Sequence, residues 1–310
     1  MKIAIVGPGA MGCLFAAFLT KAKEDVYLID HDASRAQKIR QDGLTVELPQ
    51  GDFTVKVNAT AQAKEVGVCQ AIIIAVKSYD TEEATKAVKE LIGENTQIVT
   101  LQNGIGNVQV INDIVGEERV VGGVTAHGAT LLGVGRVRHA GKGETIIGKS
   151  SGKVLGPIRD IASAFSKAGF ETKISKDINA VIWSKLIINV GINALGALTR
   201  LPNGLLAECD PTREVMRSAV QEAVKVAKRK RIKLIYDDPF QKVEGVAKAT
   251  ATNVCSTLQD ILHAKRTEID FINGAIVRQG KAFNIPTPVN EVLTGLIKTI
   301  ESSYEKRIRS

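Results

Sequence analysis

Cysteine and histidine are scarce in this 310-residue chain. Its four cysteines and four histidines lie far apart, and no two cysteines have the C-x-x-C spacing of a zinc or redox site. The scarcity argues against a metal centre and against a disulfide framework. We therefore expect no metal, and reduced thiols that serve as small hydrophobic side chains.

Long apolar runs are also lacking. The longest candidates contain Lys, Asn or Gly before they reach the roughly 18 residues that a membrane span needs. The first apolar stretch, Met1–Gly9, is too short for a secretory signal. We expect no membrane association and a cytoplasmic location.

Aromatic residues make up only 4% of the chain, and they do not accompany its positive charge. The net charge is +8, and residues 177–310 carry 20 basic and 14 acidic side chains, including a basic run from Lys225 to Lys233. Without interleaved aromatics or a DNA-reading motif, the run predicts a solvated helix end and no nucleic-acid partner. The positive field suits a small anionic substrate.

The chain has two regions that differ in their secondary-structure pattern. Residues 1–176 alternate β-rich runs with helical stretches, which predicts an α/β domain with a Rossmann-type doubly wound sheet. Two hairpins are expected within it, at residues 44–57 and 136–147. Residues 177–310 read as helix after helix, which predicts an all-α C-terminal domain. The length also favours two domains.

A glycine-rich turn opens the first domain. Gly7-Pro8-Gly9-Ala10-Met11-Gly12 fits G-x-G-x-x-G, follows a β-rich run and precedes a helical one. We expect Gly7 to permit the turn, Gly9 to let a pyrophosphate approach, and Gly12 to let helix and strand pack closely. The turn predicts a dinucleotide site in residues 1–176, formed by Gly7, Gly9, Ala10, Met11, Gly12, Asp30 and His31.

Asp30 ends the second predicted strand, 18 residues after Gly12. A carboxylate at this place accepts hydrogen bonds from ribose hydroxyls and repels a 2′-phosphate. His31 is mostly neutral at pH 7, and the sequence leaves the direction of Arg35 open. Asp30 therefore favours NADH: we expect the protein to use NADH as well as NADPH, or to prefer it.

A polar stripe crosses the apolar segment 180–198. Lys185, Asn189 and Asn193 are spaced four residues apart, so they share one face of a helix that is otherwise apolar nearly all round. A buried lysine can have a lowered pKa, which suits proton transfer. The stripe predicts a cavity wall for a polar ligand. A lysine that reaches solvent at the helix margin remains the alternative.

Further candidates lie outside this stripe. Glu268 is flanked by apolar residues, which predicts a partly buried acid that pairs with Lys185, or alternatively a solvated acid that pairs with Lys265. Lys77 and Asn103 each follow a predicted strand of the first domain, at the sheet edge where ligands bind. Asn103-Gly104 can equally be a plain turn.

Together these segments resemble the ketopantoate reductases (2-dehydropantoate 2-reductase). The matching pieces occur in the family's order over nearly the whole chain: Gly7–Gly12, Val76-Lys77, Asn103–Gly106, Trp183–Asn189, Ile192–Leu195, Pro202–Gly204, Ser256–Asp260 and Thr267–Gly274. The blocks around Lys185 and Glu268 are far more specific than the glycine turn.

The resemblance implies an oxidoreductase that transfers hydride, usually from NADPH, to the 2-keto carbon of ketopantoate. The product is pantoate, for pantothenate and coenzyme A biosynthesis. Lys185 matches the lysine that polarises and protonates the keto oxygen, and Glu268 matches the acid that hydrogen-bonds the substrate. The family's other substrate contacts fall on Asn103, Asn189, Asn193, Asn253 and Ser256. Its cofactor contacts include Lys77, Asn103 and Glu268.

One departure bears on the cofactor. Family members that use NADPH commonly carry Arg beside the end of the second strand, where this chain has Asp30-His31. Two other functions stay open: a related dehydrogenase for another 2-keto acid or an imine, and a dinucleotide-sensing or nucleic-acid-binding protein. A sensor needs no proton donor, so Lys185 favours an enzyme. The sequence leaves a homodimer open.

Overall fold

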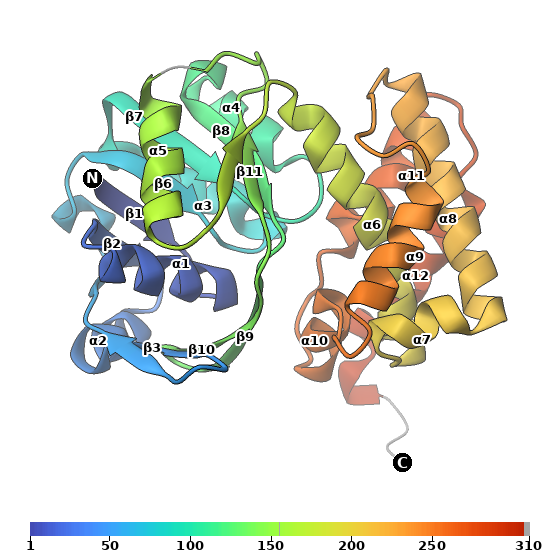
Figure 1. Cartoon of the computed structure of the whole chain (residues 1–310), viewed down its shortest axis with the longest axis horizontal. Coiled ribbons are helices and arrows are strands. Elements are labelled where there is room, and N and C mark those ends of the chain that lie inside the picture. The colour runs from blue at the N-terminus through green and yellow to red at the C-terminus, as the bar shows by residue number, and fades with distance from the viewer. Residues whose placement is uncertain (155, 307–310) are drawn as a thin grey trace. The chain divides into compact units, whose positions relative to one another are not determined.

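The structure is a computed structural model that describes residues 1–154 and 156–306 (Figure 1). The chain forms two compact units. The first contains residues 1–102 and 106–178, and the second contains residues 103–105 together with the chain from residue 179 onward. The short segment 103–105 is thus part of the second unit although the first surrounds it in sequence.

An eight-stranded sheet forms the centre of the first unit. Its strands, in spatial order, are β12 (Thr172–Ile174), β11 (Thr145–Gly148), β8 (Val120–Thr125), β7 (Ile92–Thr100), β6 (Cys69–Ile74), β1 (Lys2–Val6), β2 (Asp25–Ile29) and β5 (Asn58–Thr60). β1 lies between β6 and β2, parallel to both. The strand order reverses at β1, so the predicted Rossmann-type doubly wound sheet is confirmed.

Helices cover both faces of this sheet. They are α1 (Ala10–Lys21), α2 (Ala33–Asp42), α3 (Thr81–Ala87), α4 (Asn107–Val115) and α5 (Gly156–Lys167). Successive residues of β1 enter two different cores: Ile3 and Ile5 pack with α1 and α5, and Ala4 and Val6 pack with α3 and α4. Burial on both faces explains why residues 3–6 of β1 form a continuous apolar run instead of an alternating one.

A second sheet contains β4 (Phe53–Val55), β3 (Leu44–Glu47), β10 (Arg136–Gly141) and β9 (Gly128–Gly133), in that order. The hairpin expected at 44–57 is confirmed, because β3 and β4 pair antiparallel. The hairpin expected at 136–147 is wrong, because β10 pairs with β9. β11 instead joins β8, where the hydroxyls of Thr125 and Thr145 lie 3.0 Å apart. Gly141 and Gly143 mark a change of sheet.

The second unit is helical, as predicted. Its helices are α6 (Ile178–Thr199, which begins at the unit boundary), α7 (Asn203–Glu208), α8 (Asp210–Arg229), α9 (Pro239–Ala249), α10 (Ser256–Leu262), α11 (Asn273–Ala282) and α12 (Pro288–Ser302). α6 contributes much of the core, including Trp183, Leu186 and Val190. A Cβ at Gly191 would lie 2.7 Å from the Val243 side chain, so this glycine lets other helices approach α6 closely.

We expected no segment long and apolar enough to span a membrane. By length and mean hydropathy, α6 does meet that requirement. However, 72% of its most apolar window is buried inside the protein. A helix that is apolar nearly all round and packed by other helices is typical of the core of a large globular protein.

Candidate functional site

The glycine turn joins β1 to α1. Gly7 has a φ of +103°, and a Cβ there would lie 2.8 Å from the side chain of Val76. A Cβ at Gly12 would lie 2.0 Å from the Gly7 carbonyl oxygen. Both positions therefore require glycine for steric reasons, as the motif predicts for the turn and for helix packing.

Gly9 differs from its two neighbours in the motif. Its φ is −70°, and a Cβ there would meet only the Ala75 carbonyl oxygen, at 4.0 Å. Gly9 is the residue that precedes α1, and among the residues that the structure describes no side chain caps the helix there. The space at Gly9 and the backbone N–H groups of Ala10 and Met11 fit a pyrophosphate at a helix N-terminus. The structure thus offers the cradle that a dinucleotide needs.

Asp30 lies just after β2 and is almost fully buried, with 2% exposure. Both of its carboxylate oxygens accept hydrogen bonds from the Arg35 guanidinium, through Nε and Nη2. The backbone N–H of Asp32 donates to Oδ1 at 3.1 Å. His31 is 92% exposed, with Nδ1 3.6 Å from the same carboxylate. Asp30 is therefore engaged by Arg35, and its charge is compensated.

A buried polar network supports the carboxyl ends of β6 and β7. The sequence did not reveal this network. Gln102 Nε2 donates to the Val76 carbonyl oxygen at 2.8 Å and to Thr81 Oγ1 at 2.9 Å. Thr81 Oγ1 donates to Asn107 Oδ1, and Asn107 Nδ2 donates to Ser78 Oγ. The network fixes the backbone on both sides of Lys77. Its signal in the sequence was the polar residues that follow two apolar strands.

The segment Asn103–Ile105 belongs to the second unit and contacts it through its backbone. The Ile105 N–H donates to the Phe271 carbonyl oxygen at 3.0 Å. Gly104 has a φ of +82°, and a Cβ there would lie 2.4 Å from that same oxygen. Asn103-Gly104 is therefore a turn fitted closely against the residues that follow Glu268.

Lys185 and Glu268 interact electrostatically within the second unit. Lys185 is half-buried on α6, and Glu268 is 7% exposed just before the short helical turn Ile269–Phe271. Burial lowers the pKa of Lys185 to about 8, and the charge of Glu268 partly opposes this by raising it. The predicted partial burial of Glu268 is confirmed. An ammonium with a pKa near neutrality gives up its proton readily.

Of the two asparagines in the stripe, Asn193 is buried and Asn189 is half-buried. Asn193 is 5% exposed, and its Nδ2 donates to Ser256 Oγ at 3.4 Å. Within the described residues, the buried Nδ2 of Asn189 has no hydrogen-bond partner. An unpaired buried donor is costly unless a ligand accepts from it. Asn253 is exposed, and its carbonyl oxygen accepts from the Asn203 N–H at 3.0 Å.

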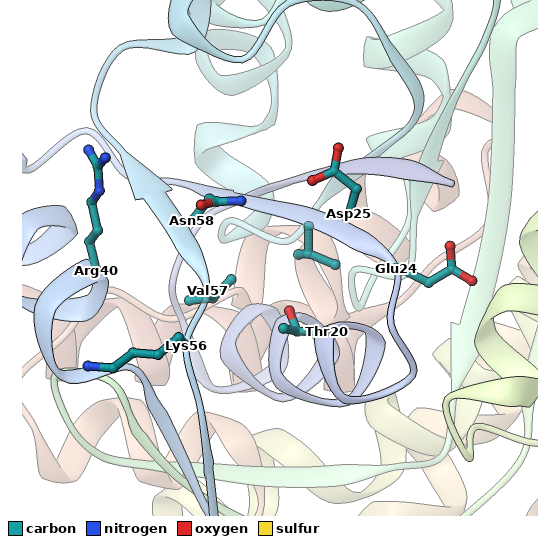
Figure 2. Close-up of a pocket in the computed structure, with 8 residues that line it drawn as sticks. Thr20, Glu24, Asp25, Arg40, Lys56, Val57 and Asn58 are labelled. Carbon is teal, nitrogen blue, oxygen red and sulfur yellow. The ribbon is translucent and has the colours of Figure 1, made fainter.

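A separate hollow of about 380 Å³ opens in the first unit (Figure 2). Figure 2 shows Glu24 and Asp25 on one side of it and Arg40 and Lys56 on the other. Asp25 is the first residue of β2, whereas the Gly7 N–H bonds the carbonyl of Ile29, the last residue of that strand. The hollow therefore lies at the opposite end of β2 from the glycine turn.

Two family models match the chain. Residues 3–152 match "Ketopantoate reductase PanE/ApbA", and residues 177–301 match "Ketopantoate reductase PanE/ApbA C terminal". The first contains the glycine turn, and the second contains Lys185 and Glu268.

Whole-length relatives agree with these matches. The chain is 37% identical to the 2-dehydropantoate 2-reductase of Pyrococcus abyssi, over 99% of this chain and 100% of the relative. It is 35% identical to that of Halobacterium salinarum, over 96% and 98%.

Solved structures show the same fold. A PanE/ApbA family ketopantoate reductase from Ralstonia eutropha has a TM-score of 0.90 at 34% identity, over 98% of this chain and 100% of that one. A D-mandelate dehydrogenase with NADH and anilino(oxo)acetate also has a TM-score of 0.90, at 28% identity over 98% and 100%.

Proposed function

Because the chain belongs to the ketopantoate reductase family, we propose that it reduces ketopantoate to pantoate with a reduced nicotinamide dinucleotide. The observation that supports this best is Lys185, a half-buried lysine with a pKa of about 8, which interacts with the buried Glu268. The open cradle at Gly9 supports the cofactor half of the proposal.

The proposed chemistry follows from where charge develops. The bound cofactor supplies a hydride to the 2-keto carbon, which places negative charge on the keto oxygen. The Lys185 ammonium stabilises that charge and donates a proton to the oxygen. Glu268 raises the pKa of Lys185 and so keeps more of it protonated. The free N–H groups of Asn189 and the hydroxyl of Ser256 are suited to bind the polar groups of the keto acid.

We propose NADPH as the preferred cofactor. A preference for NADH requires a carboxylate that is free to meet the ribose, but the carboxylate of Asp30 is engaged by Arg35. The Arg35 side chain remains 33% exposed and His31 is exposed beside it, so a guanidinium and an imidazole N–H are available to hydrogen-bond a 2′-phosphate. Arg35→Ala should lower kcat/KM for NADPH relative to NADH by about tenfold or more. An unchanged ratio would show that Arg35 does not contact the phosphate.

Another 2-keto acid remains the second candidate substrate. The similarity to D-mandelate dehydrogenase favours it, because mandelate is also a 2-hydroxy acid. Oxidation of the reduced cofactor, followed by its absorbance with ketopantoate and with phenylglyoxylate, separates the two. We expect a higher kcat/KM for ketopantoate. A higher value for phenylglyoxylate would replace the proposed substrate but keep the reaction class.

We further propose a cytoplasmic enzyme whose partners are its cofactor and a small anionic keto acid, without nucleic acid or membrane. The basic segment Lys225–Lys233 provides a test, because salt-dependent DNA binding through it would contradict this proposal. Light scattering of the purified protein decides between a monomer and a homodimer.

A further inference from the structure

A buried carboxylate joins two helices of the second unit. Glu222 on α8 is 7% exposed. Its Oε1 accepts from the Val289 N–H at 2.9 Å, and its Oε2 accepts from the Asn290 N–H at 3.0 Å and from Asn290 Nδ2 at 2.7 Å. Val289 and Asn290 stand in the first turn of α12, so Glu222 satisfies N–H groups that have no partner within that helix.

The hydrogen bonds continue from α12 to α11 and α6. Asn290 Nδ2 also donates to the Ala219 carbonyl oxygen at 3.0 Å, which uses both of its N–H groups and turns Oδ1 toward Asn273. Asn273 Nδ2 donates to Asn290 Oδ1 at 3.0 Å and to the Val190 carbonyl oxygen at 3.1 Å. The charge of Glu222 thus orients the amide of Asn290, which in turn orients Asn273.

The last two residues of this chain of bonds, Asn273 and Val190, lie close in sequence to the proposed catalytic groups. Val190 follows Asn189 directly and comes five residues after Lys185, about 7.5 Å along the helix. Asn273 comes five residues after Glu268 and begins α11. The bond from Asn273 to Val190 therefore fastens the segment that contains Glu268 to the helix that contains Lys185.

The role of Asn273 is more than to fill space, because an apolar side chain would fill the same space at a lower cost. Its exposure is 0%, and within the described residues its Oδ1 has no hydrogen-bond partner. An apolar side chain would join α6 and α11 without burying an unpaired acceptor. What an apolar side chain lacks is a directional donor to Val190, and that donor defines how α11 is placed along α6.

We propose that Asn273 is a positioning residue, which together with Asn290 and Glu222 holds the Glu268 segment against α6 in the register that pairs Glu268 with Lys185. The inference rests on the proposed function. It adds residues that touch neither substrate nor cofactor but set the relation between the two groups that do.

A double-mutant cycle tests this role, with Asn273→Ala, Glu268→Gln and the double variant measured in the full-length protein. Asn273→Ala should lower kcat about tenfold or more and leave the cofactor Kd within about threefold. Once Glu268 is Gln, the same change should lower kcat less than about threefold, because the pair that Asn273 positions is already broken.

The matched control is Ile297→Ala, since Ile297 belongs to the same core, is 0% exposed and lies on α12. It should lower Tm at least as much as Asn273→Ala, with less effect on kcat. If Asn273→Ala fails to fold, Glu222→Gln, which keeps the side-chain shape, should show the same non-additivity with Glu268→Gln.

Additive effects of Asn273 and Glu268, or equal loss of kcat in Ile297→Ala at equal loss of Tm, would overturn the positioning role. Lys185→Ala separates this failure from failure of the proposed function. If Lys185→Ala loses turnover while the cycle is additive, only the positioning role is lost. If Lys185→Ala keeps turnover, the proposed function itself fails.

Discussion

The two units form their candidate sites from different groups: the first uses the backbone, and the second uses side chains. In the first, the glycine turn offers backbone N–H groups at a helix start, and the important property of Gly9 is the empty space where a side chain would be. In the second, the groups are side chains: burial lowers the pKa of Lys185 on α6, and the charge of Glu268 partly opposes this. A backbone site is disrupted by adding atoms, whereas a side-chain site is disrupted by removing them.

The largest effect should come from removing the Lys185 ammonium. We expect Lys185→Ala to lower kcat by about 10²–10⁴-fold, the range for loss of a general acid, with little change in cofactor Kd. Steady-state kinetics and calorimetry measure the two quantities. The control is Lys265→Ala, because Lys265 is exposed. Near-normal turnover of Lys185→Ala would show that another group supplies the proton.

Adding atoms to the glycine turn should separate binding from folding. Gly9→Asp places a carboxylate where the pyrophosphate must approach, and like charges at close range cost several kcal/mol, so cofactor Kd should rise by about a hundredfold or more. Its Tm should change little, because a Cβ at Gly9 meets no close atom.

Gly12→Ala is the contrasting variant, since its Cβ would lie 2.0 Å from the Gly7 carbonyl oxygen. It should lower Tm as well as cofactor affinity. Equal Tm losses at Gly9 and Gly12, measured by thermal unfolding, would contradict the distinction between a ligand-facing and a packing glycine.

The pH dependence should reveal the coupling of Lys185 to Glu268. The protonated lysine is the active form, so kcat should be highest below a pH of about 8 and should fall as pH rises through the pKa of Lys185, about 8. Glu268→Gln removes a charge that raises this pKa, so the fall should move to lower pH. Asp270→Asn, whose acid pairs with Lys298 at 3.1 Å, is the control and should leave the profile in place.

The smallest effect concerns stability in acid. His127 and His139 are buried and stacked, with Nδ1 of His127 3.0 Å from Nε2 of His139. Burial lowers the pKa of His127 from 6.5 to about 4, so the unfolded chain binds more protons between these values. Stability should be complete above about pH 6.5 and should decline toward pH 4.

His127→Gln cannot titrate in this range, so its Tm should depend less on pH than that of the unaltered protein, by a few degrees over the interval. His31→Gln is the control, because that side chain is exposed. Parallel Tm curves for all three proteins would exclude His127 as the source of acid sensitivity.

Local sequence predicted the first unit well where the elements are set by local pattern. The β-rich run expected before the glycine turn is the strand Lys2–Val6, and the helical run expected after it is the helix Ala10–Lys21. The failure at 136–147 arose because β10 and β11 read as neighbours in sequence, while each has a partner strand elsewhere. Strand pairing is non-local, so a glycine between two β-rich runs does not reveal which sheet each run joins.

The sequence by itself determined which residues are able to act: a stripe of Lys185, Asn189 and Asn193 on one helical face, and a glycine turn with its spacing to Asp30. Helical and strand periodicity place such side chains without any knowledge of distant contacts. Tertiary structure decided what surrounds them. Arg35 engages Asp30, the Phe271 carbonyl oxygen accepts from the Ile105 N–H beside Asn103-Gly104, and burial lowers the pKa of Lys185. The physical reason is that pairing and desolvation depend on groups that are close in space, and only folding brings those groups together.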